Sequence, residues 1–164
     1  MHYFEILSTD VHEEPIFLVL AGGIGWKSDK LIELINNSPY RNRIVLTGYV
    51  SVEEKVQLYR LCKAFVFPSH YEGFGTPIIE AQSQGAMVIS ANNSSLVEVG
   101  GDSVAYVKNE NDVFELEQIM EYVLSKNKED IAETKKTRIR KHQKIFLGEY
   151  CKKKIKKEFE KIEV

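Results

Sequence analysis

The sequence predicts a doubly wound α/β domain, in which a parallel sheet is flanked by helices. Three observations lead to this fold class. Short apolar runs occur without polar alternation, which is typical of strands buried on both faces. Stretches with helical spacing of apolar residues separate these runs, and glycine or proline marks several of the junctions. Strand and helix therefore alternate along the 164 residues, as in parallel α/β sheets.

Five apolar runs have the length of buried strands. The first ends at Gly22-Gly23, the second at Gly48, and the third is stopped by Pro68. The expected strands are, in order, Ile16–Ala21, Arg43–Thr47, Ala64–Phe67, Met87–Ser90 and Ser103–Val107. Ligands of such sheets bind beyond the carboxyl ends of the strands, so we expect function in the turns that follow these runs.

Four stretches with helical patterns lie between and after these runs. Ser51 and Glu54 fit a capping box at one helix start, and Pro77 suits the first turn of another helix, which Gly85 ends. The expected helices are Ser28–Asn37, Ser51–Cys62, Thr76–Gln84 and Val113–Ser125. We expect residues 1–164 to form a single domain, with 128–164 as C-terminal helices and Met1–Leu7 as a further helix.

Composition excludes several classes of protein. There are 22 basic and 24 acidic residues, a net charge of −2, which argues against a chain whose main task is binding nucleic acid. Two cysteines are too few for a disulfide scaffold, and no apolar run is long enough to span a bilayer. These features predict a cytoplasmic protein.

The charge is unevenly distributed along the chain. The segment from Thr134 to Val164 holds 12 basic and 4 acidic residues, a net of +8, so the first 133 residues carry −10. One reading is a solvated helix that docks onto a domain through apolar residues at helical spacing, which are Cys151, Ile155, Phe159 and Ile162. The other reading is a tail that contacts a membrane or a partner protein.

The segment Pro68–Glu80, PSHYEGFGTPIIE, holds the densest set of functional signals. Its two glycines allow a tight bend, and the backbone N–H groups at the following helix start form a site for an anion such as phosphate. Glu72 precedes the bend and Glu80 lies about one turn into the helix, so carboxylates that accept hydrogen bonds from sugar hydroxyls flank the phosphate site. This arrangement favours a nucleotide-sugar. The simpler reading is that both glutamates face solvent and only favour the helix dipole.

This segment resembles the E-x7-E signature of the retaining family 4 (group 1) glycosyltransferases of GT-B fold. Three further segments resemble that family in the same order: Ala21–Trp26, Leu46–Val50 and Ser94–Asp102. The resemblance covers most of the chain. It implies the Rossmann-like, C-terminal half of a GT-B fold, which is the donor-binding domain.

The resemblance implies a role for each matching residue. Glu72 would be the catalytic residue that meets the donor sugar, and Glu80 would hold the ribose hydroxyls. Gly23 would line the donor pocket, and the turn with Tyr49 and Val50 would border the nucleobase. The diphosphate would be held by the backbone N–H groups of Phe74, Gly75 and Thr76.

The resemblance also implies a reaction. A hexose would pass from a nucleotide-diphosphate donor to an acceptor hydroxyl with retention of configuration, in polysaccharide or glycoconjugate biosynthesis. The segment Ser90–Glu98 favours mannosyl- or rhamnosyl-type relatives. No metal or other cofactor is expected, and the partner would be a missing N-terminal acceptor-binding domain. The location would be the cytoplasm or the cytoplasmic face of the membrane, with a peripheral membrane contact of the full-length enzyme.

The chain departs from the family pattern at several positions. Nothing upstream of Ile16 matches the Arg and Lys that neutralise the leaving diphosphate in the family. Met87 and Val97 stand where the family has proline, and Phe146-Leu147-Gly148 replaces an aromatic-Ser-Trp. We therefore expect this chain alone to bind a nucleotide and to transfer nothing.

Readings from other classes stay open. The chain fits a non-catalytic module that binds a nucleotide or saccharide, or an interaction domain that uses its basic tail. His70 reads as a loop residue near the pocket rim. Ser94-Ser95 reads as a helix cap, and the alternative is a contact with the sugar. Trp26 and Tyr71 suit either ligand stacking or packing, and Cys62 reads as a core residue at a helix end.

Overall fold

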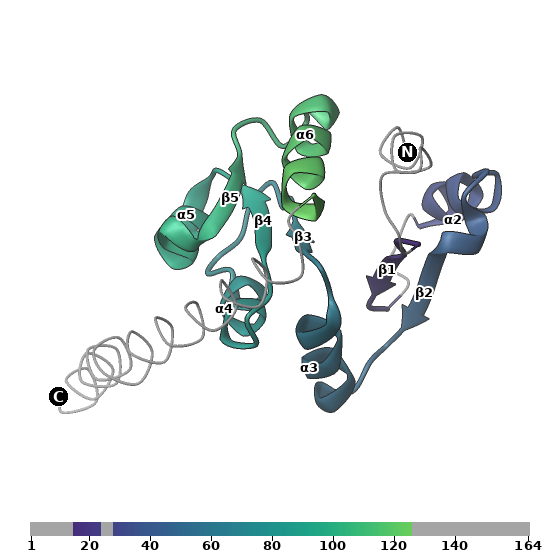
Figure 1. The fold of residues 1–164 in the computed structure, drawn as a ribbon, viewed down its shortest axis with the longest axis horizontal. Coiled ribbons are helices and arrows are strands. Elements are labelled where there is room, and N and C mark those ends of the chain that lie inside the picture. The colour runs from purple at the N-terminus through teal and green to yellow at the C-terminus, as the bar shows by residue number, and fades with distance from the viewer. Residues whose placement is uncertain (1–14, 24–27, 126–164) are drawn as a thin grey trace, which may run out of the picture. The chain divides into compact units, whose positions relative to one another are not determined.

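The computed structural model describes residues 15–23 and 28–125 (Figure 1). The chain divides into two compact units, Met1–Lys55 and Val56–Val164. The helices expected over Met1–Leu7 and 128–164 lie outside the described residues, as does Trp26. A single domain over the whole chain stays a prediction.

The first unit is built on two parallel strands. β1 (Leu18–Ala21) pairs with β2 (Ile44–Gly48) in the register Leu18 to Ile44, with a shift after Leu20. Between them come α2 (Asp29–Asn36) and a short 3-10 helix (Arg41–Arg43). A small core of Ile35 and Ile44 forms here, with Leu18, Leu20 and Tyr40 packed against it. The strands and the helix appear where the apolar runs predict them.

Helix α3 (Val52–Leu61) contains the boundary between the two units. Its first turn is a capping box, as predicted. The Ser51 N–H donates to Glu54 Oε2 at 2.7 Å, and the Glu54 N–H donates to Ser51 Oγ at 3.1 Å. These two bonds satisfy backbone donors that the helix itself leaves without partners.

The second unit contains a three-stranded parallel sheet in the order β3-β4-β5. Its strands are β3 (Phe65–Phe67), β4 (Val88–Ala91) and β5 (Val104–Val107). All four residues of the central strand β4 are buried. The helices that follow the strands are α4 (Thr76–Ser83), α5 (Ser94–Gly100) and α6 (Val113–Leu124), with a 3-10 helix (Gly101–Ser103) before β5.

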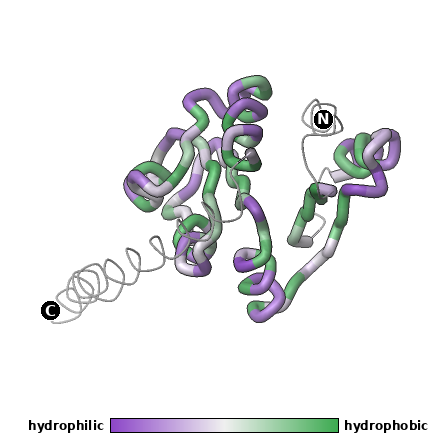
Figure 2. The backbone as a smooth tube through the Cα atoms, in the orientation of Figure 1, coloured by the Kyte–Doolittle hydropathy of each residue, from purple (hydrophilic) through white to green (hydrophobic). Residues whose placement is uncertain are grey.

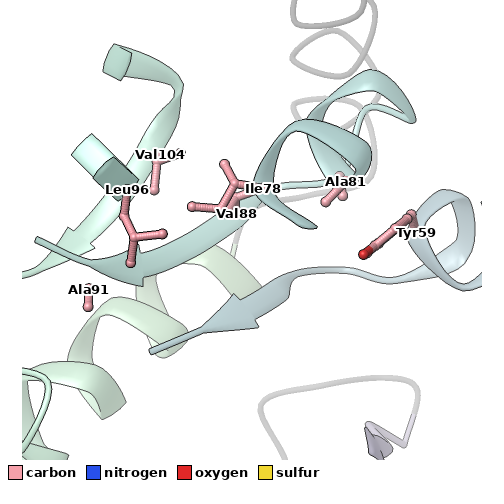
Figure 3. Packing of buried hydrophobic residues seen from close by; sticks show 8 residues of the cluster. Tyr59, Ile78, Ala81, Val88, Ala91, Leu96 and Val104 are labelled. Atoms are coloured by element: carbon pink, nitrogen blue, oxygen red, sulfur yellow. The ribbon is translucent and has the colours of Figure 1, made fainter. Parts of the chain in front are cut away.

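Two apolar clusters pack on this sheet. One joins Tyr59 of α3 to Ile78, Val88 and Leu96, and Figure 3 shows these side chains reaching from α3 past α4 to α5. The other cluster joins Met87, Ile89 and Val107 to Val123 of α6. Val88 and Ile89 are consecutive and lie in different clusters, as expected when a strand is buried on both faces. Each such buried side chain contributes about 1.5–3 kcal/mol of transfer free energy.

Helices thus pack on the sheet through both clusters, which confirms the predicted α/β class. Figure 2 shows apolar residues along the strands and mixed polar and apolar residues along α6, as expected for an amphipathic helix. Asp112 caps α6 by accepting from the N–H groups of Phe114 and Glu115.

Two expectations need correction. The strands expected to form one sheet are paired, among the described residues, in two sheets. An apolar run indicates that a strand is buried, and it carries no information on its pairing partner. The cap predicted at Ser94-Ser95 is also corrected: Asn93 holds the N-cap position of α5, and the Ser95 hydroxyl donates to the Glu72 carbonyl of another loop.

Candidate functional site

The β3–α4 loop makes the predicted glycine bend. Gly75 adopts a left-handed backbone (φ 81°) as the N-cap of α4, and the helix begins at Thr76 with Pro77 in its first turn. A Cβ at Gly75 would lie 2.8 Å from Leu96 Cδ2, so both conformation and space require glycine here. Gly73 and Thr76 are exposed. Gly75 itself is buried, so the accessible parts of the bend are Gly73 before it and Thr76 after it.

Glu72 is held at both its side chain and its backbone. Ser69 Oγ donates to Glu72 Oε1 at 2.9 Å, and Ser95 Oγ donates to the Glu72 carbonyl at 2.8 Å. The residue is half-buried. Its carboxylate is thus oriented by its own loop, and its main chain is fixed by the first turn of α5.

Glu80 lies one turn into α4 and is half-buried. Its Oε2 accepts a hydrogen bond from the Tyr59 hydroxyl of α3 at 3.3 Å. Burial and then the negative charge of Glu80 raise the pKa of Tyr59 above its usual 10.0, so the phenol stays protonated to a higher pH than an exposed tyrosine does. The Tyr59 ring is itself placed edge-on against Phe65, with ring centroids 5.0 Å apart.

The loops that follow the three strands of this unit are joined by polar contacts. His70 Nδ1 lies 3.1 Å from Glu110 Oε1, which links the loops after β3 and β5. The Asn93 amide donates to the Ser69 carbonyl at 3.1 Å, which links the loops after β3 and β4. The backbone N–H of Glu110 and then His70 lower the pKa of the Glu110 carboxyl. His70 is exposed, as expected for a loop residue, and its place at a pocket rim stays a prediction.

In the first unit, the turns after β1 and β2 meet. The Gly22 N–H donates to the Gly48 carbonyl at 2.9 Å, and Gly48 has φ +67°. A Cβ at Gly23 would lie 2.6 Å from Tyr49 Cε2, so the Tyr49 ring rests against the Gly23 backbone. Val50 is half-buried beside it in the chain. The predicted residues Gly23 and Tyr49 are thus brought together.

Three residues near the predicted site were not singled out from the sequence as its supports. Tyr59, Asn93 and Ser95 each bond to the segment that carries Glu72 and Glu80. Their partners lie 21 to 24 positions away in the chain. A sequence pattern at helical or strand spacing cannot report such a pairing. The β4–α5 turn was expected to carry function because it follows a strand and adjoins a segment that resembles the family, and neither signal shows that it supports Glu72.

The described residues contain neither a cluster of metal-binding side chains nor a helix that could span a membrane. Among residues 15–23 and 28–125, no three or more His, Cys, Asp or Glu side chains gather where they could hold a metal ion. No helix in these ranges has the length and apolar character needed to cross a membrane. The basic C-terminal segment lies outside these ranges.

Comparisons with known sequences agree with the resemblance. The family model described as "Glycosyl transferases group 1" matches residues 3–145. The O-antigen chain mannosyltransferase B of Escherichia coli is 44% identical over 96 residues, which are 58% of this chain and 25% of that protein. A D-inositol 3-phosphate glycosyltransferase of Rhodococcus jostii (strain RHA1) is 33% identical over 104 residues, 62% of this chain and 22% of that protein. The chain thus spans a quarter or less of the length of these relatives.

Solved structures share the fold. The crystal structure of TarM aligns with a TM-score of 0.72 and 16% identity, over 99% of this chain and 31% of TarM. The pneumococcal O-GlcNAc transferase GtfA, in complex with UDP and GlcNAc, aligns with a TM-score of 0.69 and 18% identity, over 99% of this chain and 32% of GtfA. At these identities the likeness concerns the fold alone, and it supports the Rossmann-like α/β class.

Proposed function

Because the chain belongs to the group 1 glycosyltransferases, a family that transfers sugars, we propose that the chain binds the nucleoside diphosphate sugar that serves as donor. The observation that carries the proposal is the glycine bend at the start of α4, which Glu72 precedes and Glu80 follows by one turn. Gly23, Tyr49 and Val50 are assigned to donor binding by the resemblance.

The start of α4 suits the diphosphate. The first N–H groups of a helix have no partner within it, and the helix dipole places partial positive charge there. We assign the diphosphate to the backbone N–H groups of Phe74, Gly75 and Thr76, because these residues lie at the left-handed bend where α4 begins. When the bond from the sugar to the diphosphate breaks, negative charge grows on the phosphate oxygens. Donors that are already in place stabilise that charge without reorganising.

The two glutamates suit the two hydroxyl-bearing ends of the donor. Glu80 would accept hydrogen bonds from the ribose hydroxyls, and the Tyr59 hydroxyl keeps one of its oxygens in place. Glu72 would accept from hydroxyls of the sugar and so orient the carbon that reacts. The acceptor hydroxyl would form its bond to that carbon, lose its proton, and the nucleoside diphosphate would leave.

Finer features of the reaction belong to the same proposal. The resemblance and the likeness to the O-antigen chain mannosyltransferase B of Escherichia coli favour transfer of a hexose, with mannose as the first sugar to test. Retention of configuration and a role in polysaccharide synthesis follow from the resemblance. We propose that the 164-residue chain binds the donor without transferring its sugar, because the second substrate must also be held for transfer to occur.

The proposal is tested by nucleotide binding. The melting temperature should rise with UDP, GDP, dTDP or ADP, because a ligand that binds the folded state stabilises it by about 2.7 kcal/mol at a concentration of 100 times Kd. Glu80→Ala should weaken binding of the selected nucleotide by about 1–3 kcal/mol in calorimetry, since a buried ribose would lose its acceptor.

The matched control is Glu121→Ala, which removes an exposed carboxylate on α6 and should leave the affinity unchanged. Equal affinities of wild type and Glu80→Ala would remove Glu80 from the site. A chain whose melting temperature responds to none of the four nucleotides would overturn the proposal.

A further inference from the structure

The start of α5 touches the Glu72 loop at three successive points. The Asn93 amide donates to the Ser69 carbonyl, and Ser95 Oγ donates to the Glu72 carbonyl at 2.8 Å. Leu96 then packs so closely on Gly75 that a Cβ at that glycine would lie 2.8 Å from Leu96 Cδ2. These contacts span the loop from its first residues to the helix that follows it. The first turn of α5 thus acts as a platform for the loop.

The helix that carries this platform, α5, is itself held by neighbouring elements. The fully buried Gln82 of α4 donates from Nε2 to the Gly100 carbonyl at 2.9 Å. The Tyr106 hydroxyl of β5 lies 3.1 Å from the Gly101 carbonyl and 3.3 Å from that of Leu96. Leu96 has no exposed surface. The helix is therefore held by α4, by β5 and by the core, and it cannot shift without disturbing buried contacts.

We propose that Ser95 and Asn93 are positioning residues for Glu72. Ser95 fixes the main chain of Glu72, Asn93 fixes the loop at Ser69, and the Ser69 hydroxyl on Oε1 fixes the direction of the carboxylate. This inference rests on the proposed function, in which Glu72 meets the donor sugar. A group that orients a substrate must be held to about 0.5 Å by its supporting residues. The network around Glu72 supplies such support from the start of α5.

The inference makes a selective prediction for Ser95→Ala. Loss of the hydroxyl removes the bond that fixes the Glu72 main chain. Binding of the sugar end of the donor should therefore weaken more than binding of the diphosphate end. In calorimetry, the affinity for a sugar-nucleotide should fall about fivefold to tenfold, the effect of one hydrogen bond, while that for its nucleoside diphosphate changes less than about twofold. The probes are GDP-mannose with GDP, and UDP-GlcNAc with UDP. Ser95→Thr keeps the hydroxyl and should restore the ratio.

Two further variants serve as the reference and the control for this comparison of affinities. Glu72→Ala should show the same selective loss, because it removes the group that Ser95 positions. Ser125→Ala is the matched control: it removes a hydroxyl that donates to a carbonyl at 2.9 Å, at the end of α6. It should change neither affinity. Selective loss in Glu72→Ala and in Ser95→Ala, with rescue by threonine, supports the inference.

Other outcomes separate the two proposals. If Glu72→Ala is selective and Ser95→Ala is not, the positioning role is overturned and the proposed function stands. If Glu72→Ala leaves the ratio unchanged, the positioning role is overturned and Glu72 loses its assigned place at the sugar, while the response to the four nucleotides still decides donor binding. If none of the four nucleotides binds, both proposals are overturned. Equal losses for both ligands in Ser95→Ala would show a general structural role and overturn the positioning role.

Amide hydrogen exchange tests the platform without any ligand. In Ser95→Ala, the amides of residues 73–76 should exchange faster, while those of β4 and α6 keep their protection. Unchanged exchange in the loop would overturn the inference. If Ser95→Ala does not fold, Ser69→Ala takes its place in the affinity comparison, because it removes the bond to the Glu72 carboxylate and leaves α5 intact. An unchanged ratio in that variant also overturns the inference.

Discussion

At the scale of single residues, two hydroxyl groups fix the position of Glu72 in the candidate site. Ser69 and Ser95 each use one hydroxyl, one on the carboxylate and one on the carbonyl of the same residue. Neither bond is worth more than about 1–2 kcal/mol for stability. The two bonds matter because they orient Glu72: one holds its carbonyl and the other holds its carboxylate, which leaves the side chain little freedom to rotate.

Gly75 makes the second residue-scale argument. Gly75→Ala should lower the free energy of unfolding by about 2–3 kcal/mol, because a side chain is strained by about 1–2 kcal/mol in the left-handed region and its Cβ would meet buried Leu96. Urea denaturation measures the loss. Gly73→Ala is the control, because a Cβ there meets nothing within 4 Å. Equal stabilities of the two variants would contradict the argument.

At the scale of elements, the sequence predicted most helices and strands close to their observed bounds. The capping box at Ser51, the left-handed Gly85 after α4 and Asp112 before α6 are local signals, readable within one turn of chain. The bounds of α5 were not predicted. Its sequence, SSLVEVG, is short and rich in valine, and the helix is held in place by Gln82 and Tyr106 from other elements.

The packing of α5 against β5 gives an element-scale prediction. A Cβ at Gly100 would lie 2.5 Å from the Tyr106 hydroxyl oxygen and 2.7 Å from Val104 Cγ2. Gly100→Ala should therefore cost about 2–3 kcal/mol of stability, and Tyr106→Phe about 1 kcal/mol through lost bonds to the carbonyls that end α5.

The double variant isolates the contact. Removing the hydroxyl also removes the closest clash, so Gly100→Ala with Tyr106→Phe should cost less than the sum of the two single changes. Chemical denaturation of all four proteins supplies the double-mutant cycle. Additive losses would mean that the structure accommodates the alanine by movement elsewhere. They would contradict the argument that the Tyr106 hydroxyl makes alanine unfavourable at Gly100.

At the scale of the whole molecule, the family match runs through residues 3–145 and so includes residues of both compact units. Local pattern predicted the order of elements and placed the glycine bend between Glu72 and Glu80. It could not predict which strands pair, because an apolar run indicates that a strand is buried but not which strand it pairs with or in which register. It also could not predict the Tyr59–Glu80 contact, since 21 residues separate two side chains that only tertiary packing brings together.

That contact links the candidate site to the stability of the chain at high pH. Burial and then Glu80 raise the pKa of Tyr59 above 10.0, so the folded state keeps its proton where the unfolded state releases it. The unfolded state then binds fewer protons, and the free energy of unfolding falls as pH rises above about 10, by at most about 1.4 kcal/mol per pH unit for one such group. Below that pH the contribution of Tyr59 is fully present.

Tyr59→Phe should therefore flatten the loss of stability between about pH 10 and 12, even though the variant is less stable than wild type at pH 7 through its lost bond to Glu80. Urea denaturation at a series of pH values measures both effects, the first as a slope and the second as an offset. Tyr122→Phe, at a tyrosine that is 65% exposed on α6, is the control and should keep the wild-type slope.

Because burial also raises the pKa of Tyr106, part of the slope should survive in Tyr59→Phe. A wild-type slope in Tyr59→Phe would show that this phenol ionises as readily in the folded chain as in the unfolded one, and Tyr59 would then lose its assigned place as a protonated donor to Glu80.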